Sequence, residues 1–279
     1  MSKSTTKKIA APKAPKSKIL PIAILYEDAN ILAINKPAGL MVHPDGRSEG
    51  PFLTDWLVKK YPRIKKVGET MFAPDGQQIV RPGIVHRLDR ETSGVMLVAK
   101  TAKGHACLKE QFKARTITKK YLAFVWGEFT EDFGTINRPI GRSGSDFRKW
   151  SAQRGSRGIP RRAETYWSLI KTFRASVKYD VASGESKAGT TKDEKFSLIE
   201  AEPKTGRTHQ IRVHFLALHH PVVGDSLYAE GKPYALGFKR TALHAKHIEF
   251  SNVKGERIKL DAELPADFAK ACEEFAIKV

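Results

Sequence analysis

One carboxylate is singled out by its neighbours in the sequence. Positions 86–94 read HRLDRETSG, and Asp89 lies between Arg87 and Arg90. Nearby cations favour the ionised form of a carboxyl group, and an ionised carboxylate can act as a nucleophile or a general base. Apolar, strand-like residues on both sides would hold such a loop in a fixed direction. Asp89 is therefore a catalytic candidate, and an aspartate that only caps a turn is the structural alternative.

A second polar segment, TGRTHQIRVH at 205–214, combines helical spacing with two arginines. Arg207 and Ile211 fall on one helical face, and Arg212 projects from a neighbouring face. Thr208 is expected to cap a helix that runs to about residue 219. Gly206 before this cap would leave backbone N–H groups free for a phosphate.

Zinc is a weak alternative for the same segment. His209 and His214 are five residues apart, so they do not share a face as ligands four apart would. No third ligand has suitable spacing. No metal site is therefore expected.

A third segment, KKYLAFVWG at 119–127, is typical of a strand rich in aromatic and branched residues. Tyr121 lies on the opposite face from Leu122 and Phe124. Its ring could stack on a flat base in a cleft, or it could be an ordinary core tyrosine.

The elements that must position these residues are mostly strands. Apolar runs predict strands at 22–26, 31–34, 84–86, 95–99, 121–126, 166–179, 196–202, 243–250 and 257–260, and helices at 54–61, 101–115 and from 208 to about 219. A loop is expected at 68–82, a loop or hairpin at 143–162, and a polar insertion at 184–195. Strands outnumber helices without regular alternation, so we expect an α+β fold around a largely antiparallel or mixed sheet.

Charge indicates the kind of partner. The 279 residues include 49 Lys and Arg against 30 Asp and Glu, a formal net charge of +19. Six lysines and no acid lie in residues 1–20, and residues 139–162 carry seven basic residues against one acid. A polyanion is the expected partner, with RNA, DNA and anionic lipid as candidates.

The N-terminal residues, the apolar stretches and the cysteines bear on targeting, membrane insertion and redox state. Residues 1–20 are expected to be a disordered basic arm, and a mitochondrial presequence is disfavoured because they contain no Arg and two prolines. No apolar stretch approaches the ~20 residues of a membrane-spanning helix. Cys107 and Cys272 are expected to be reduced thiols.

Taken together, these motifs resemble the RluA-type RNA pseudouridine synthases. The resemblance covers roughly residues 22–268 and adds NKPAGL at 35–40, VHP at 42–44 and LHA at 243–245, all in the family order. It implies a pseudouridine synthase catalytic fold with a central RNA-binding cleft over 21–279. Several members of that family carry an N-terminal S4 RNA-binding module, and as a departure from them no S4 domain is expected in residues 1–20.

The resemblance also implies roles for individual residues. Asp89 would be catalytic, Tyr121 would stack on the target base, Arg212 would pair with Asp89, and Arg87 would occupy the space left by the flipped nucleotide. The remaining candidates for substrate binding share the same motifs: His86, Thr92, Arg207, His209 and Ile211.

The resemblance further implies an isomerase that acts on RNA without metal or cofactor. Ribosomal RNA of the large subunit is the expected partner and transfer RNA the alternative, for a cytoplasmic monomer that does not bind membranes. Two other functions stay open: an RNA-binding or ribosome-assembly protein without catalysis, and an unrelated carboxylate enzyme such as a glycoside hydrolase. The latter would normally need two carboxylates across the scissile bond.

Overall fold

The fold is that of a computed structural model, which describes residues 21–44, 50–68, 70–72, 76, 78–153, 156–179 and 190–279. The expected arm at 1–20 lies outside the described residues, as do residues 184–189 of the insertion expected at 184–195.

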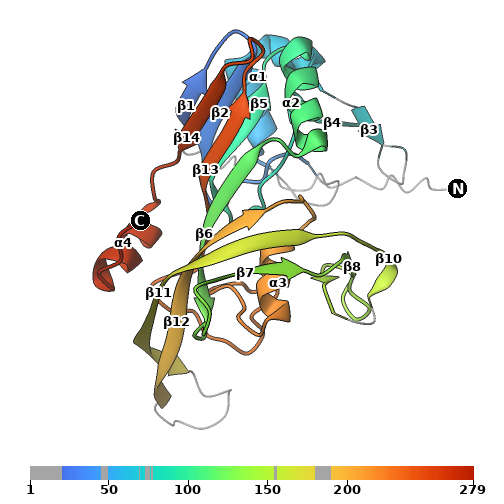
Figure 1. Cartoon of the computed structure of the whole chain (residues 1–279). Coiled ribbons are helices and arrows are strands. Elements are labelled where there is room, and N and C mark those ends of the chain that lie inside the picture. The colour runs from blue at the N-terminus through green and yellow to red at the C-terminus, as the bar shows by residue number, and fades with distance from the viewer. Residues whose placement is uncertain are drawn as a thin grey trace, which may run out of the picture.

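One nine-stranded sheet forms the framework (Figure 1). Eight strands follow the order β1 (Ala23–Glu27), β2 (Ile31–Lys36), β5 (Ser93–Ala99), β13 (Leu243–Ser251), β6 (Thr118–Trp126), β12 (Thr190–Pro203), β11 (Glu164–Tyr179) and β7 (Phe133–Asn137). The ninth, β14 (Arg257–Asp261), pairs with β13. Only β5 and β13 run parallel among the described pairs. The predicted α+β fold with a largely antiparallel, mixed sheet is confirmed.

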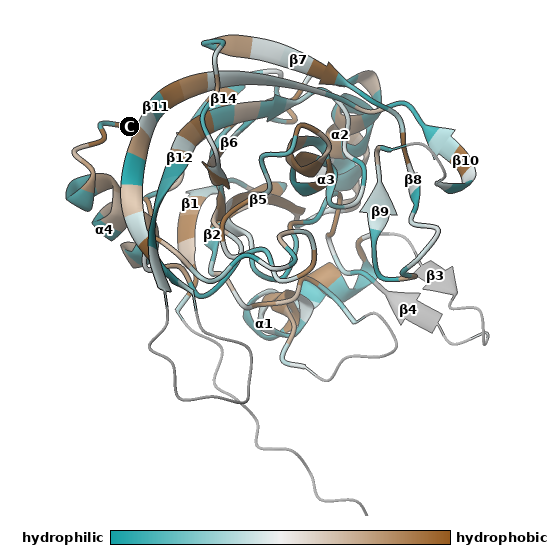
Figure 2. Cartoon of the chain, turned by 90° about the horizontal axis from the view of Figure 1, so that it is seen from below, coloured by the Kyte–Doolittle hydropathy of each residue, from teal (hydrophilic) through white to brown (hydrophobic). Residues whose placement is uncertain are grey.

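Helices are few and pack at the sides of the sheet. They are α1 (Leu53–Lys60), the 3-10 helix η1 (Pro62–Lys66), α2 (Ala102–Ala114), α3 (Gln210–Ala217) and α4 (Ala266–Glu274). The Thr101 hydroxyl accepts a hydrogen bond from Gly104 N and so caps the start of α2. In Figure 2 the long strands β11 and β12 curve around α3.

Two hydrophobic clusters fill the two halves of the molecule. One surrounds Phe124 and Phe196 on the β6, β11 and β12 side, and the other surrounds Leu32 and Leu97 on the β2 and β5 side. Tyr121 packs against both clusters. The residue expected to stack on a base therefore lies where the two halves meet.

A small three-stranded sheet adjoins α3, with the order β10 (Arg157–Arg161), β8 (Ile140–Arg142) and β9 (Trp150–Ser151). This part of the chain, residues 139–162, is called the basic lobe below. Ile140 packs with Val213 of α3 and with Tyr228 in a separate cluster that attaches the lobe to the rest of the molecule. The loop or hairpin expected at 143–162 is thus built into a small sheet.

Four local expectations were wrong. Residues 84–86 form no strand, because Ile84 makes only an isolated bridge to Val98. The loop expected at 68–82 contains the paired strands β3 (Thr70–Phe72) and β4 (Gln78–Val80). Strand β12 extends back to Thr190 into the polar segment, because pairing with β11 outweighs the polar composition. Thr208 does not cap the helix: α3 begins at Gln210, after His209 in a left-handed conformation with φ 56°.

Candidate active site

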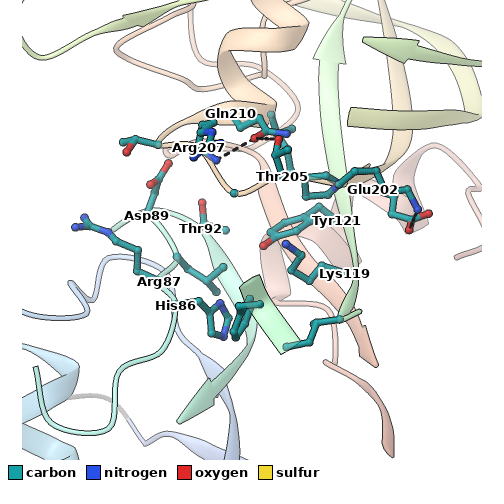
Figure 3. A pocket seen from close by; sticks show the side chains of 18 of the residues that line it. His86, Arg87, Asp89, Thr92, Lys119, Tyr121, Glu202, Thr205, Arg207 and Gln210 are labelled. Atoms are coloured by element: carbon teal, nitrogen blue, oxygen red, sulfur yellow. Dashed lines mark hydrogen bonds and ion pairs between the residues drawn. The ribbon is translucent and has the colours of Figure 1, made fainter. Parts of the chain in front are cut away.

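All nine candidate residues line one pocket of about 550 Å³. Asp89 and Arg87 lie on the loop before β5, Tyr121 lies on β6, and Arg207 lies on the loop before α3 (Figure 3). Segments more than 100 residues apart in sequence therefore converge on one site, as the motif combination predicts.

The loop that carries Asp89 is fixed from several sides. Lys36 Nζ and Gly39 N both donate hydrogen bonds to Arg90 O, at 3.2 and 2.8 Å. Thr241 donates from its N–H and its hydroxyl to Glu91 Oε2, at 2.9 and 2.8 Å. These bonds fix the backbone on the C-terminal side of Asp89, so the carboxylate is held in a defined position.

Arg212 joins two carboxylates. Its Nη1 donates to Asp89 Oδ2 at 3.0 Å, and its Nε and Nη2 donate to the two oxygens of Asp225 at 2.6 and 2.7 Å. The Asp225 side chain is fully buried and also accepts the backbone N–H groups of Leu227 and Tyr228. Such a two-point contact fixes the direction of the guanidinium plane. Asp225 therefore orients the arginine that contacts Asp89.

Electrostatics keep Asp89 ionised. Burial would raise the pKa of its carboxyl, but the neighbouring His209 and Arg212, the hydrogen bond from Arg212, and Arg87 outweigh burial and lower the pKa below its ordinary value. Asp89 therefore carries a negative charge at neutral pH, as a nucleophile or a base requires.

His209 is linked to Asp89 and to the basic lobe. Its Nε2 lies 3.9 Å from Asp89 Oδ2, and its Nδ1 lies 2.7 Å from Tyr228 Oη. Tyr228 Oη accepts the backbone N–H of Trp150 in β9 at 2.9 Å. Burial lowers the pKa of His209 and the charge of Asp89 opposes that shift. The two nitrogens of the ring therefore link Tyr228 on one side to Asp89 on the other.

Tyr121 presents a neutral phenol to the pocket. Burial, and secondarily the charge of Asp89, raise the pKa of its hydroxyl. No hydrogen bond of this hydroxyl is found among the described residues. The ring is available for stacking and the hydroxyl can donate a proton or a hydrogen bond.

The other candidates lie around these groups. Arg87 is exposed, with Nη1 3.3 Å from His43 Nε2. His86 Nε2 accepts Leu97 N–H at 2.8 Å, so this ring nitrogen is used within the protein. Thr92 and Ile211 are buried in the pocket wall.

The loop before α3 is organised by one amide. Gln210 Oε1 accepts from the Thr205 hydroxyl at 2.7 Å and from Arg207 N at 2.9 Å (Figure 3). Its amide nitrogen donates to Glu164 O at 2.9 Å. This single side chain fixes the direction from which Arg207 and His209 enter the pocket.

Sequence reasoning missed four polar residues around the site. Asp225 and Tyr228 lie within three residues of each other in a segment after α3, and an acid directly after the apolar PVVG run at 221–224 was the available signal. Lys36 is fully buried, and its Nζ contacts three carbonyl oxygens. Lys119 lines the pocket beside Tyr121, and burial lowers its pKa to about 8.

Two further observations concern the whole described chain. Among residues 21–279, apart from the gaps given above, no group of three His, Cys, Asp or Glu is placed to hold a metal ion, and no helix is long and apolar enough to span a membrane. Cys107 and Cys272 are free thiols, as expected.

Comparison with known proteins gives consistent matches. Residues 30–217 match the family described as RNA pseudouridylate synthase. The chain is 33% identical over 256 residues to ribosomal large subunit pseudouridine synthase D of Zymomonas mobilis, covering 89% of this chain and 71% of that protein. It is 36% identical over 263 residues to the protein of the same name in Xanthomonas campestris, covering 90% and 68%.

A solved structure is similar as well. Human RNA pseudouridylate synthase domain containing 1 superimposes with a TM-score of 0.62 at 26% identity, covering 88% of this chain and 84% of that one. The similarity thus extends over most of both chains.

Proposed function

The chain belongs to the RNA pseudouridylate synthase family and is an RNA pseudouridine synthase, and from this premise we propose that it modifies uridines of large-subunit ribosomal RNA. The names of the relatives in Zymomonas mobilis and Xanthomonas campestris support this target. Transfer RNA is the competing target. A cytoplasmic monomer is part of the same proposal.

The reaction sets what the site must supply. The N1–C1′ bond of uridine breaks, the uracil turns, and a C5–C1′ bond forms; the hydrogen on C5 leaves as a proton and N1 takes up a proton. The product has the same atoms as the substrate, so no oxidant, reductant or group donor is required. The protein must hold the detached base, supply a carboxylate and move one proton.

The observation that carries the proposal is an ionised Asp89 inside a basic pocket. Seven Arg or Lys residues and two acids line that pocket. Such a pocket attracts the phosphates of RNA, while Arg212 keeps the carboxylate ionised and directed inward. A glycoside hydrolase is disfavoured because neither candidate for its second carboxylate is free: Glu91 accepts hydrogen bonds from Thr241 and does not line the pocket, and Glu202, the other acid of the lining, pairs with Lys204.

Base flipping accounts for the remaining residues. Neither C1′ nor C5 can be reached while the base is stacked, so the uridine must turn out of the RNA at a cost of a few kcal/mol. Tyr121 would stack on the flipped uracil and offer its hydroxyl as a proton donor. Arg87, exposed beside the pocket, would fill the space left in the RNA.

The test uses unmodified large-subunit ribosomal RNA and a pool of unmodified transfer RNAs, each transcribed with tritium on C5 of uridine. The purified protein is expected to release tritium from the ribosomal RNA and to form pseudouridine at discrete positions. Release from transfer RNA alone would refute the ribosomal target. No release from either RNA would refute the proposal.

A further inference from the structure

Three arginines from distant parts of the chain come together at and beside the pocket. Arg115 follows α2, Arg161 ends β10, and Arg207 lies before α3. Arg115 and Arg207 line the pocket. Arg207 Nε donates to Arg162 O at 3.0 Å, which ties its loop to the end of β10. We name Arg115, Arg161 and Arg207 the arginine rim.

The charges of the arginine rim act on each other and are only partly compensated: Glu164 acts on Arg115, but its ion pair is with Arg162. Burial, and then the charges of Arg161 and Arg115, lower the pKa of Arg207. Among the described residues, no carboxylate forms an ion pair with any of the three. Both acids of this region have other partners: Glu164 pairs with Arg162, and Glu202 pairs with Lys204. Like charges that are only partly compensated destabilise the folded state until an anion binds.

The backbone of Arg115 gives an independent reason to assign a role to its side chain. Arg115 ends α2 in a left-handed conformation, with φ 60° and ψ 33°. Glycine is the usual residue at such a helix end, because a side chain is strained there. Helix stability would therefore favour glycine at this position. The arginine side chain reaches the pocket instead.

We propose that the arginine rim binds a backbone phosphate of the RNA next to the flipped uridine. A guanidinium group matches two phosphate oxygens at once, and several such groups can converge on one anion. A nucleotide whose base lay between Asp89 and Tyr121 would bring its phosphates near Arg207, which lines the same pocket (Figure 3). The inference rests on the proposed function for the identity of the polyanion.

The experiment measures RNA affinity as a function of salt. The full chain and the variants Arg115→Gly, Arg161→Gln and Arg207→Gln bind unmodified large-subunit ribosomal RNA over a series of KCl concentrations. Each variant is expected to weaken binding several-fold and to reduce the slope of log affinity against log salt, by at most about 0.7 to 0.9, the value for one phosphate contact. Lys270→Gln, an exposed position on α4 outside the pocket, is the matched loss of charge and should leave the slope unchanged.

The melting temperature separates binding from folding. Arg115→Gly should melt no lower than the parent protein, because glycine removes the strained backbone and one repelling charge. An unchanged salt slope in the three rim variants, or an equal loss in Lys270→Gln, would overturn the proposal. If the rim variants have reduced salt slopes but the parent protein forms no pseudouridine in the same RNA, the phosphate contact of the rim is upheld and the proposed RNA target is refuted. Normal pseudouridine formation with unchanged slopes would refute the rim alone.

Discussion

At the scale of single residues, the charge of Asp89 depends on Arg212, which contacts both Asp89 and Asp225. Arg212 contacts Asp225 through two nitrogens and Asp89 through one. The buried Asp225 fixes the arginine, and Nη1 of Arg212 is directed at the carboxylate of Asp89. Arg212 thus serves as a positioning residue for Asp89 as well as a source of positive charge.

Arg212→Ala should shift the acid limb of the pH–rate profile to higher pH. In the parent protein the pKa of Asp89 lies below its ordinary value, so activity is lost only as pH falls through that low pKa. Without Arg212, burial raises the pKa of Asp89, and protonation then begins at a higher pH. Single-turnover rates with saturating RNA from acid to neutral pH measure this shift.

Arg212→Lys is the matched variant for this prediction, because it keeps the charge but loses the two-point contact with Asp225. Arg212→Lys should shift the acid limb of the pH–rate profile less than Arg212→Ala does. Identical acid limbs in the alanine variant and the parent would contradict the role assigned to Arg212.

Tyr228→Phe tests the link between His209 and the basic lobe. The change removes the hydroxyl shared by His209 Nδ1 and Trp150 N, while the ring facing Arg212 is kept. We expect roughly a tenfold lower rate at saturating RNA, and about 1–2 kcal/mol lower stability from the lost hydrogen bonds.

Tyr26→Phe is the control for that measurement, because it removes another hydrogen-bonded hydroxyl, on β1 and outside the pocket. It should lower stability without lowering the rate. Equal rates for the two phenylalanine variants would show that Tyr228 is only structural.

At the scale of elements, the parallel contact between β5 and β13 positions the loop that carries Asp89. Ser93 and Gly94 pair with His244 and Ala245. The Ser93 hydroxyl lies 3.0 Å from His244 Nδ1. Gly94 has φ +113°, and a Cβ there would lie 2.2 Å from Ala245 O. The glycine at the end of HRLDRETSG is therefore required by the close approach of β13.

Gly94→Ala should destabilise the protein by roughly 2–4 kcal/mol, because both the backbone conformation and the space exclude a side chain. Gly255→Ala is the matched control. It also has a positive φ, +87°, but no atom lies within 4 Å of the added Cβ, so only backbone strain of about 1–2 kcal/mol is expected. Chemical denaturation of both variants measures the difference, and equal losses would contradict the packing explanation.

The sequence predicted elements best where a continuous apolar run was present. The strands at 95–99 and 121–126 were correctly expected because apolar, branched and aromatic residues follow one another without interruption. The region 190–195 was misjudged because pairing with β11 is a long-range contact that leaves no local pattern. The helix cap at Thr208 failed because the Gln210 side chain organises the preceding loop instead.

The site residues, too, were predictable where a local motif contains them and not where distant segments meet. Asp89, Tyr121 and Arg212 were accessible from the sequence because they occur in dense motifs. Asp225 was not, because it approaches Arg212 only when the chain turns back after α3. The buried amine of Lys36 was missed for the same reason: it bonds Arg90 O, 54 residues away.

At the scale of the whole molecule, positive charge is concentrated outside the catalytic motifs. Residues 1–20 carry six lysines and no acid, and the basic lobe carries seven basic residues against one acid. Such segments strengthen binding to RNA without defining the reaction. The pocket then selects the nucleotide that reacts.

Deleting residues 1–20 should weaken RNA binding and flatten its salt dependence, because the contacts of these lysines with phosphates release counterions. Affinity measured over a series of salt concentrations tests this expectation. A salt slope equal to that of the full chain would show that this segment does not contact RNA.

The most direct measurement compares the parent protein with Asp89→Asn on unmodified large-subunit ribosomal RNA, scoring pseudouridine by mass spectrometry and RNA affinity in parallel. The amide keeps the shape of the side chain and removes its charge. Pseudouridine formation should fall at least about a thousandfold, while affinity stays within about threefold because phosphate contacts dominate binding. Residual turnover close to that of the parent protein would contradict the assignment of Asp89 as the catalytic residue.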